Sequence, residues 1–449
     1  MRVNLKFDVM KDGPYRVLFC VTLPLAICSI ISMFVAPITT QLVSRYVGQT
    51  YFTCVALVNT VLMAFQQVVG AIVSAAWIKT AYSLKGQDEK QRQQAFWSAT
   101  YAIVGVQVTL ALLLILLVDP IFTWIHIPGE IYGQVKLYYC VFLTIYALTS
   151  FVSFVTTLVN GFCSALGIFL IQLLGLLVNV SCNFLLLPAL PGSVADPEIV
   201  GAVCRLVIGA IAVLMLRKSG LLFRIGKQEC RPDWKLIWSI IRYGFLIALQ
   251  TLLCSVGYLL VSVQTNAHLP LAYIAVLSIS IPVTTPMAHF STACSVFIPP
   301  NYDAGNYQRV KRFVKIAQIG CMLYSLLSFG VYALMGQWYY GTLFSDPQII
   351  AYGKTFWLWQ GIGYVAVSVL CVMRTVYDSV GLGKLSLVCG ICELSANLLC
   401  AFWLIPAFGI IGRDLSYPLG YWLAALFLLI SYPMLRKRIY APAKQMQKE

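Results

Sequence analysis

Acidic residues and histidines are scarce in this chain. It carries 16 Asp and Glu against 31 Lys and Arg, with three His in 449 residues. Charged residues make up 10% of the total, which excludes an ordinary soluble domain, where about 25% are charged. The sequence also lacks the His-Glu-x-x-His motif of zinc proteases and the Gly-x-Ser-x-Gly motif of serine hydrolases. We therefore expect no enzyme, no catalytic residues, no bound metal and no organic cofactor.

Long hydrophobic stretches make up most of the chain. A bilayer core about 30 Å thick requires about 20 apolar residues in each crossing helix, and 60% of this chain is hydrophobic. Because an open sheet leaves backbone groups unpaired in lipid, we expect an all-α membrane protein. The twelve predicted transmembrane helices are 17–43, 51–78, 96–118, 137–159, 163–187, 198–216, 237–264, 270–298, 314–335, 352–376, 385–408 and 416–434.

An internal repeat relates the two halves of the chain. The segment from Asn179 to Pro188 matches the segment from Asn397 to Pro406, with the Asn and the Pro at the same spacing. Many secondary transporters consist of two such repeats around a central pathway. The repeat therefore predicts two pseudo-symmetric six-helix bundles. The expected parts are an N-terminal lobe, a cytoplasmic linker and a C-terminal lobe, at 1–218, 219–235 and 236–449.

Basic residues gather in alternate connections between the predicted helices. They precede the first helix, follow the second, join the sixth to the seventh, follow the eighth and close the chain. The positive-inside rule then places both termini in the cytoplasm, and we expect a multi-pass protein of the plasma (inner) membrane of a prokaryote. This topogenic charge accounts for most of the formal net charge of +15, so nucleic acid is not an expected partner.

Two ionisable residues are predicted to lie deep in the membrane. Glu393 is about nine residues from the inner end of 385–408, and Arg205 is about eight residues from the outer end of 198–216, roughly 13 and 12 Å deep. Charges in hydrocarbon are expensive, so both are candidates for function. Three roles are open for Glu393: a proton carrier of an antiporter, a site for a cationic substrate, or a structural partner of another group such as Arg205.

Amide side chains recur on one face of the fifth predicted helix. Asn183 follows Asn179 by four residues and Gln172 precedes Asn179 by seven, spacings that place all three on one side. Asn397 occupies the position of Asn179 in the second half. These amides either line a cavity and coordinate a partly dehydrated cation, or hydrogen-bond to neighbouring helices.

The chain resembles the MATE family of multidrug and toxic-compound exporters, within the superfamily that also holds lipid-linked oligosaccharide flippases. The resemblance covers nearly the whole chain. It rests on the two six-helix halves and on four segments: Val43-Ser-Arg-Tyr-Val-Gly48, Lys85-Gly-Gln-Asp-Glu-Lys90, Asn160-Gly161 and the segment from Asn179 to Pro188. It implies a V-shaped transporter that alternates between outward- and inward-facing states and exchanges H⁺ or Na⁺ for a substrate.

Three positions depart from the family pattern. Where the family commonly has carboxylates, this chain has Thr39 in the first helix, Asn183 in the fifth and Cys254 in the seventh. The resemblance then implies that coupling has moved to Glu393, that coupling differs, or that this chain is from an atypical substrate branch. In the first lobe Thr39 and Asn183 supply neutral oxygens for Na⁺ beside Asn179, although no carboxylate there neutralises the ion.

The sequence thus predicts a monomeric secondary transporter that exports amphipathic small molecules, organic cations among them, by antiport with H⁺ or Na⁺. Its expected partners are the substrate, the coupling cation and the lipid bilayer. A flippase-like exporter of a lipid-linked saccharide is the alternative, and a non-transporting membrane enzyme or assembly factor is a third hypothesis. The candidate residues of the cation site or substrate cavity are Thr39, Gln172, Asn179, Asn183, Arg205, Glu393 and Asn397.

Overall fold

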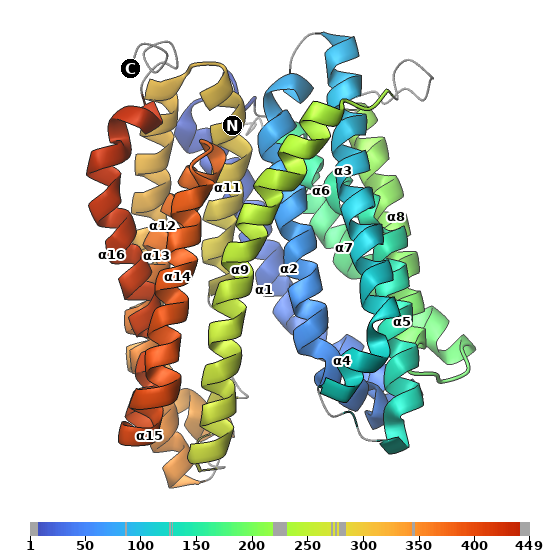
Figure 1. The fold of residues 1–449 in the computed structure, drawn as a ribbon, viewed down its shortest axis with the longest axis vertical. Coiled ribbons are helices and arrows are strands. Elements are labelled where there is room, and N and C mark those ends of the chain that lie inside the picture. The colour runs from blue at the N-terminus through green and yellow to red at the C-terminus, as the bar shows by residue number, and fades with distance from the viewer. Residues whose placement is uncertain are drawn as a thin grey trace, which may run out of the picture. The chain divides into compact units, whose positions relative to one another are not determined.

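A computed structural model describes residues 8–85, 88–124, 127, 129–218, 231–270, 273, 276–277, 284–343 and 346–440. The regular elements of this described part are helices (Figure 1). In the first half they are α1 Pro14–Tyr46, α2 Gln49–Lys85, α3 Glu89–Leu116, α4 Val118–Trp124, α5 Tyr132–Leu148, α6 Ser150–Phe162, α7 Ala165–Leu186 and α8 Asp196–Lys218. In the second half they are α9 Trp234–His268, α11 Thr284–Asp303, α12 Tyr307–Leu343, α13 Pro347–Ser379, α14 Gly383–Leu399, α15 Ile405–Phe408 and α16 Ile410–Tyr440.

The long apolar helices confirm the predicted all-α membrane fold. Within the described residues nine helices are long and apolar enough to cross a membrane, or ten when the bent pair of α5 and α6 counts as one span. Each of the twelve predicted ranges overlaps a helix. Of the range 270–298, only 270, 273, 276–277 and the residues from 284 onward are described. Residues 219–230 of the predicted linker lie outside the described residues.

The chain divides into two compact units. The first comprises Met1–Lys11 and Leu23–Ala248, and the second comprises Asp12–Thr22 and Leu249–Glu449. This division differs from the linker predicted at 219–235, because the start of α9 joins the first unit. Its side chains at Ile237, Ile240 and Ile247 pack into the hydrophobic core of that unit.

Aromatic side chains lie in the core of the first unit. Phe96 on α3 stacks on Phe154 of α6 with ring centroids 5.9 Å apart, and Trp77 of α2 packs into the same cluster. All three are almost fully buried. A buried aromatic side chain contributes a large apolar contact area to a core. The contacts among these three side chains therefore hold α2, α3 and α6 together.

Two glycines bring α9 and α14 close together in the second unit. A Cβ atom on Gly390 of α14 would lie 2.9 Å from the backbone oxygen of Gln250 on α9. A Cβ atom on Gly257 of α9 would lie 2.9 Å from the side chain of Asn397 on α14. Both distances are shorter than real contacts allow. Small residues let membrane helices approach in this way, and the approach carries polar side chains of α9 to those of α14.

A proline changes the helix type at the end of α14. Cys400–Leu404 is a π-helical segment between α14 and α15. Pro406 follows it, and a proline inside a helix lacks the N–H donor and clashes with the carbonyl four residues earlier, here that of Phe402. In the first half the matching Pro188 lies in a short 3₁₀ segment, Leu187–Ala189, where α7 ends. π-helical segments occur often at functional sites.

Candidate functional site

A buried carboxylate lies among helices of the second unit. Glu393 on α14 is 2% exposed. Its Oε1 forms an ion pair with a guanidinium nitrogen of Arg374 on α13. Its Oε2 accepts a hydrogen bond of 3.2 Å from the hydroxyl of Tyr258 on α9. One cation and one neutral donor, from two other helices, therefore hold this carboxylate.

The guanidinium of Arg374 has a second partner on α9. With the Gln250 amide oxygen facing it, that oxygen accepts hydrogen bonds from Arg374 Nη1 at 3.0 Å and from Nε at 2.8 Å. Gln250 is buried. A guanidinium presents its donors as a planar fork, so it bridges an amide and a carboxylate at once. Arg374 thereby connects α13 to both α9 and α14.

Asn397 lies one turn from Glu393 on α14 and is 1% exposed. Neither its amide oxygen nor its amide nitrogen has a hydrogen-bond partner among the described residues. A buried polar group without a partner destabilises a fold by about 1–3 kcal/mol. The side chain is therefore positioned to bind a small polar ligand or water.

A second polar cluster lies where α16 begins. The hydroxyl of Tyr273 donates a hydrogen bond to Asp414 Oδ1. The neighbouring Arg413 lies over the ring of Tyr417 at 4.4 Å from its centroid. Arg413 and Asp414 fall between the predicted helices 385–408 and 416–434, and the connection predicted there is wrong. The helix begins at Ile410, and both side chains are almost fully buried.

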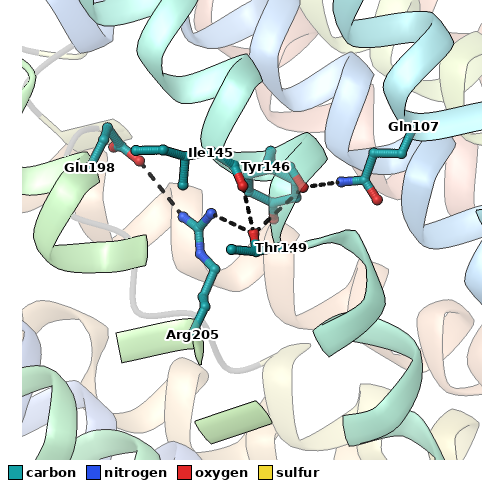
Figure 2. Close-up of polar contacts among 6 residues, drawn as sticks. All are labelled: Gln107, Ile145, Tyr146, Thr149, Glu198 and Arg205. Atoms are coloured by element: carbon teal, nitrogen blue, oxygen red, sulfur yellow. Dashed lines mark hydrogen bonds and ion pairs between the residues drawn. The ribbon is translucent and has the colours of Figure 1, made fainter. Parts of the chain in front are cut away.

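The fourth predicted transmembrane helix of the first unit is broken at Thr149. Its two parts, α5 and α6, meet at 51°. The Thr149 hydroxyl donates to the carbonyl of Ile145 at 2.8 Å, and Gln107 Nε2 on α3 donates to the carbonyl of Tyr146 at 2.9 Å (Figure 2). Hydroxyl back-bonding and an inserted side chain are known causes of helix bends. The bend therefore follows from side chains, without a proline.

Arg205 of α8 lies beside this bend. Its Nη1 is 3.5 Å from Thr149 Oγ1 and its Nη2 is 3.7 Å from Glu198 Oε2 (Figure 2). The guanidinium also lies over the ring of Tyr146, 4.6 Å from its centroid. The hypothesis that Arg205 is the structural partner of Glu393 is not supported, because Glu393 pairs with Arg374. Glu198 and Arg205 are seven residues apart on one face of α8, which brings them together.

The amides of the fifth predicted helix meet in part. Asn183 Nδ2 on α7 donates to the backbone oxygen of Asn179 at 2.7 Å and lies 3.3 Å from its side-chain oxygen. Asn183 is 7% exposed and Asn179 is half-buried, whereas Gln172 is exposed on the same helix. Thr39 is half-buried on α1. The structure thus joins Asn179 and Asn183, and it shows no bond from Gln172 to either of them.

Several residues of these clusters escaped sequence analysis. Arg374 stands two residues before the end of the predicted range 352–376, close to its boundary, whereas α13 continues to Ser379. Tyr258 lies eight residues after Gln250 on α9, a weak signal because the chain has 25 tyrosines. Within the described residues no three His, Cys, Asp or Glu side chains are grouped as metal ligands. The Glu393 carboxylate can accept a proton on one of its oxygens.

Comparisons with known proteins agree with this fold. The MatE family model matches residues 247–403. A curated relative, the "Probable multidrug resistance protein NorM" of Chromobacterium violaceum, is 24% identical over 356 residues, which cover 70% of this chain and 71% of the relative.

Solved structures share the fold over almost the whole chain. An outward-facing multidrug resistance MATE family transporter of the MOP superfamily has a TM-score of 0.84 at 15% identity, covering 97% of this chain and 98% of that one. A MOP superfamily transporter from Pyrococcus furiosus, reported with a binding pocket of reverse polarity, has the same values. A Vibrio cholerae MATE transporter has a TM-score of 0.80 at 14% identity, with 96% and 99% covered. The chain therefore shares the fold of MATE transporters, and its residues 247–403 match the MatE family model.

Proposed function

We propose that the chain is a secondary active exporter of amphipathic small molecules, organic cations among them, and that it works by alternating access in exchange for a proton. The buried Glu393 in its ion pair with Arg374 is the observation that carries this proposal. The name of the Chromobacterium relative supports multidrug substrates. The charge distribution of the connections supports cytoplasmic termini in the inner membrane.

The surroundings of Glu393 favour H⁺ over Na⁺ as the coupling ion. Arg374 already supplies a positive charge at the carboxylate, so Na⁺ would have to displace a guanidinium. A proton needs only one carboxylate oxygen. The described neighbours of the carboxylate offer few further oxygens, chiefly the hydroxyl of Tyr258, whereas hard metal cations require several oxygen ligands.

Protonation of Glu393 changes the contacts between three helices. A neutral carboxyl group loses most of its attraction for Arg374, and the guanidinium keeps Gln250 as its remaining partner. The contact from α13 to α14 then weakens while the contact from α13 to α9 persists. An exchanger requires an element with two arrangements whose balance the coupling ion shifts, and this ion pair is such an element.

The test is accumulation of a cationic dye, ethidium, in bacterial cells that lack their major exporters. Cells that produce the wild type should accumulate less dye than empty-vector cells, and a protonophore should abolish the difference. Glu393→Gln keeps the shape of the side chain but cannot titrate, so it should accumulate dye like the empty vector. Glu130→Gln, a change of an exposed carboxylate, is the matched control and should behave as the wild type.

Export by Glu393→Gln with the pH dependence of the wild type would refute the role of Glu393. Equal dye accumulation in wild-type and empty-vector cells, with equal amounts of protein in the membrane, would refute multidrug export. The flippase-like export of a lipid-linked saccharide would then be the hypothesis to test next.

A further inference from the structure

Buried polar atoms without partners occur at or near two carboxylates of the second unit, Asp414 and Glu393. Asp414 is fully buried, and its Oδ2 has no hydrogen-bond partner among the described residues. The same holds for Arg413 Nε and for both amide atoms of Asn397. Asn397 is one turn from Glu393 on α14, on the side of the π-helical segment. In folded proteins buried water commonly binds such atoms, and each water typically makes about three hydrogen bonds.

Tyrosines connect the two carboxylates along α16. Asp414, Tyr417 and Tyr421 follow one another at about one turn each, so they span about 10 Å of the helix. The ring of Tyr417 lies 4.9 Å from that of Tyr258 and 6.4 Å from that of Tyr421. Tyr421 is hydrogen-bonded to Tyr258, and Tyr258 donates to Glu393. Hydroxyl groups both donate and accept, as a proton relay requires.

Arg374 contacts the carboxylate oxygen of Glu393 that Tyr258 does not. Its guanidinium lies next to the carboxylate and is followed, one turn further along α13, by Asp378. A fixed positive charge repels a hydronium ion, which is how arginines exclude protons from water-filled pores. A proton delivered to Glu393 from the opposite side would therefore meet this charge and would not pass beyond it as a leak.

We propose that Asp414 is a second proton-binding carboxylate, and that water bound by Asn397, together with the tyrosine hydroxyls of α9 and α16, relays protons from Asp414 to Glu393. This inference rests on the proposed proton-coupled function. At each step one O–H bond breaks as another forms: a hydronium ion protonates Asp414, the proton passes through water, and it ends on a Glu393 oxygen. Asp414 is then a carboxylate again, and Glu393 is neutral.

The relay is surrounded by few other charged groups. Asp414 is faced by Tyr273, with Arg413 beside it on α16 and Cys400 of the π-helical segment near that arginine. The ionisable groups near Glu393 are Arg374 and Cys371 of α13, Cys254 and Tyr258 of α9, Tyr421 of α16, and Cys389 and Cys392 of α14.

Infrared difference spectroscopy on the purified full-length protein tests the relay without a substrate. After a rapid drop in pH, bands of protonated carboxyl groups appear, and the band lost in Glu393→Gln belongs to Glu393. In Asp414→Asn and in Asn397→Leu this band should still form, but about tenfold more slowly. A tenfold slower rate corresponds to an increase of about 1.4 kcal/mol in the activation barrier. Asn301→Leu alters a buried amide of α11 outside the relay and should keep the wild-type rate.

A Glu393 band that rises at the wild-type rate in both relay variants would overturn the proposal. The proposal would also be overturned if the spectrum of Asp414→Asn lacked none of the protonated-carboxyl bands of the wild type. Thermal unfolding shows whether each relay variant is folded. If one variant folds poorly, the rate measured with the other variant still tests the proposal. The proposed function fails by a different result, namely pH-dependent dye export by Glu393→Gln.

Discussion

Arg374 on α13 and Glu393 on α14 form an ion pair inside the second unit, with 22% and 3% of their side chains exposed. Removal of one partner of a buried pair leaves an uncompensated charge and destabilises a protein by about 3–5 kcal/mol. Arg374→Met should therefore lower the thermal unfolding temperature of the purified protein strongly. The double variant Arg374→Met/Glu393→Gln should recover part of the loss. A double variant as unstable as the sum of its single changes would contradict the direct pairing.

The close approach of α9 and α14 gives a packing prediction. Gly390→Leu places a side chain where the backbone oxygen of Gln250 already lies, and such overpacking destabilises by about 1–3 kcal/mol. Gly330→Leu, on α12, is the matched control, because a Cβ atom there meets nothing within 4 Å. Thermal unfolding in the same detergent compares the two. Equal unfolding temperatures would show that α9 and α14 are not in close contact at Gly390.

The bend at Thr149 depends on a side chain of α3. Gln107→Leu removes the donor that satisfies the Tyr146 carbonyl, and an unpaired buried acceptor destabilises by about 1–3 kcal/mol. Gln172→Leu makes the same chemical change at an exposed position of α7 and should change the free energy of unfolding by less than about 0.5 kcal/mol. Denaturation followed by circular dichroism measures both. A Gln107 variant as stable as the wild type would mean that the carbonyl has another donor.

Asn179 separates the cavity hypothesis from the structural one. Asn179→Ala retains the backbone oxygen that accepts the shorter bond from Asn183, so the protein should still fold. If its side chain lines the transport cavity, dye export should fall severalfold while the amount of protein in the membrane stays unchanged. Asn59→Ala, an exposed amide of α2, serves as the control. Unchanged export by Asn179→Ala would exclude a cavity role.

The exposed pair of Asp119 and Lys136 predicts a pH dependence of stability. Asp119 Oδ1 accepts bonds of 2.5 Å from Lys136 Nζ and from the Tyr132 hydroxyl, and these bonds lower the pKa of Asp119 below its ordinary value. The contribution of the pair to stability is therefore fully present above the unfolded pKa of about 3.9 and is lost as the pH falls through the lower folded pKa.

Lys136→Met removes the main cause of this shift. Acidification should then lower the unfolding temperature of the wild type slightly more than that of the variant, and high salt should reduce the difference because it screens exposed charges. A variant with the same acid sensitivity as the wild type at low salt would show that this pair does not contribute.

The helices and the depth of one carboxylate could be predicted from the sequence. The hydropathy of each stretch and the rise of 1.5 Å per residue are local properties, so they located the helices and placed Glu393 in the middle of one of them. The repeat of Asn179 as Asn397 also needed no structure. The relation between Asn179 and Asn183 followed from helical spacing alone, and their hydrogen bond agrees with it.

Only the tertiary structure decided which groups meet. From the sequence, Arg205 was one possible ion-pair partner of Glu393. In the structure α13 packs near α14, and the ion pair forms with Arg374. Packing also buries Asp414, which sequence had placed in a connection. The physical reason is that hydropathy reports how a residue prefers water or lipid, whereas an ion pair requires two side chains from different helices to point at one another. That direction is set by the contacts of whole helices, which no short stretch of sequence contains.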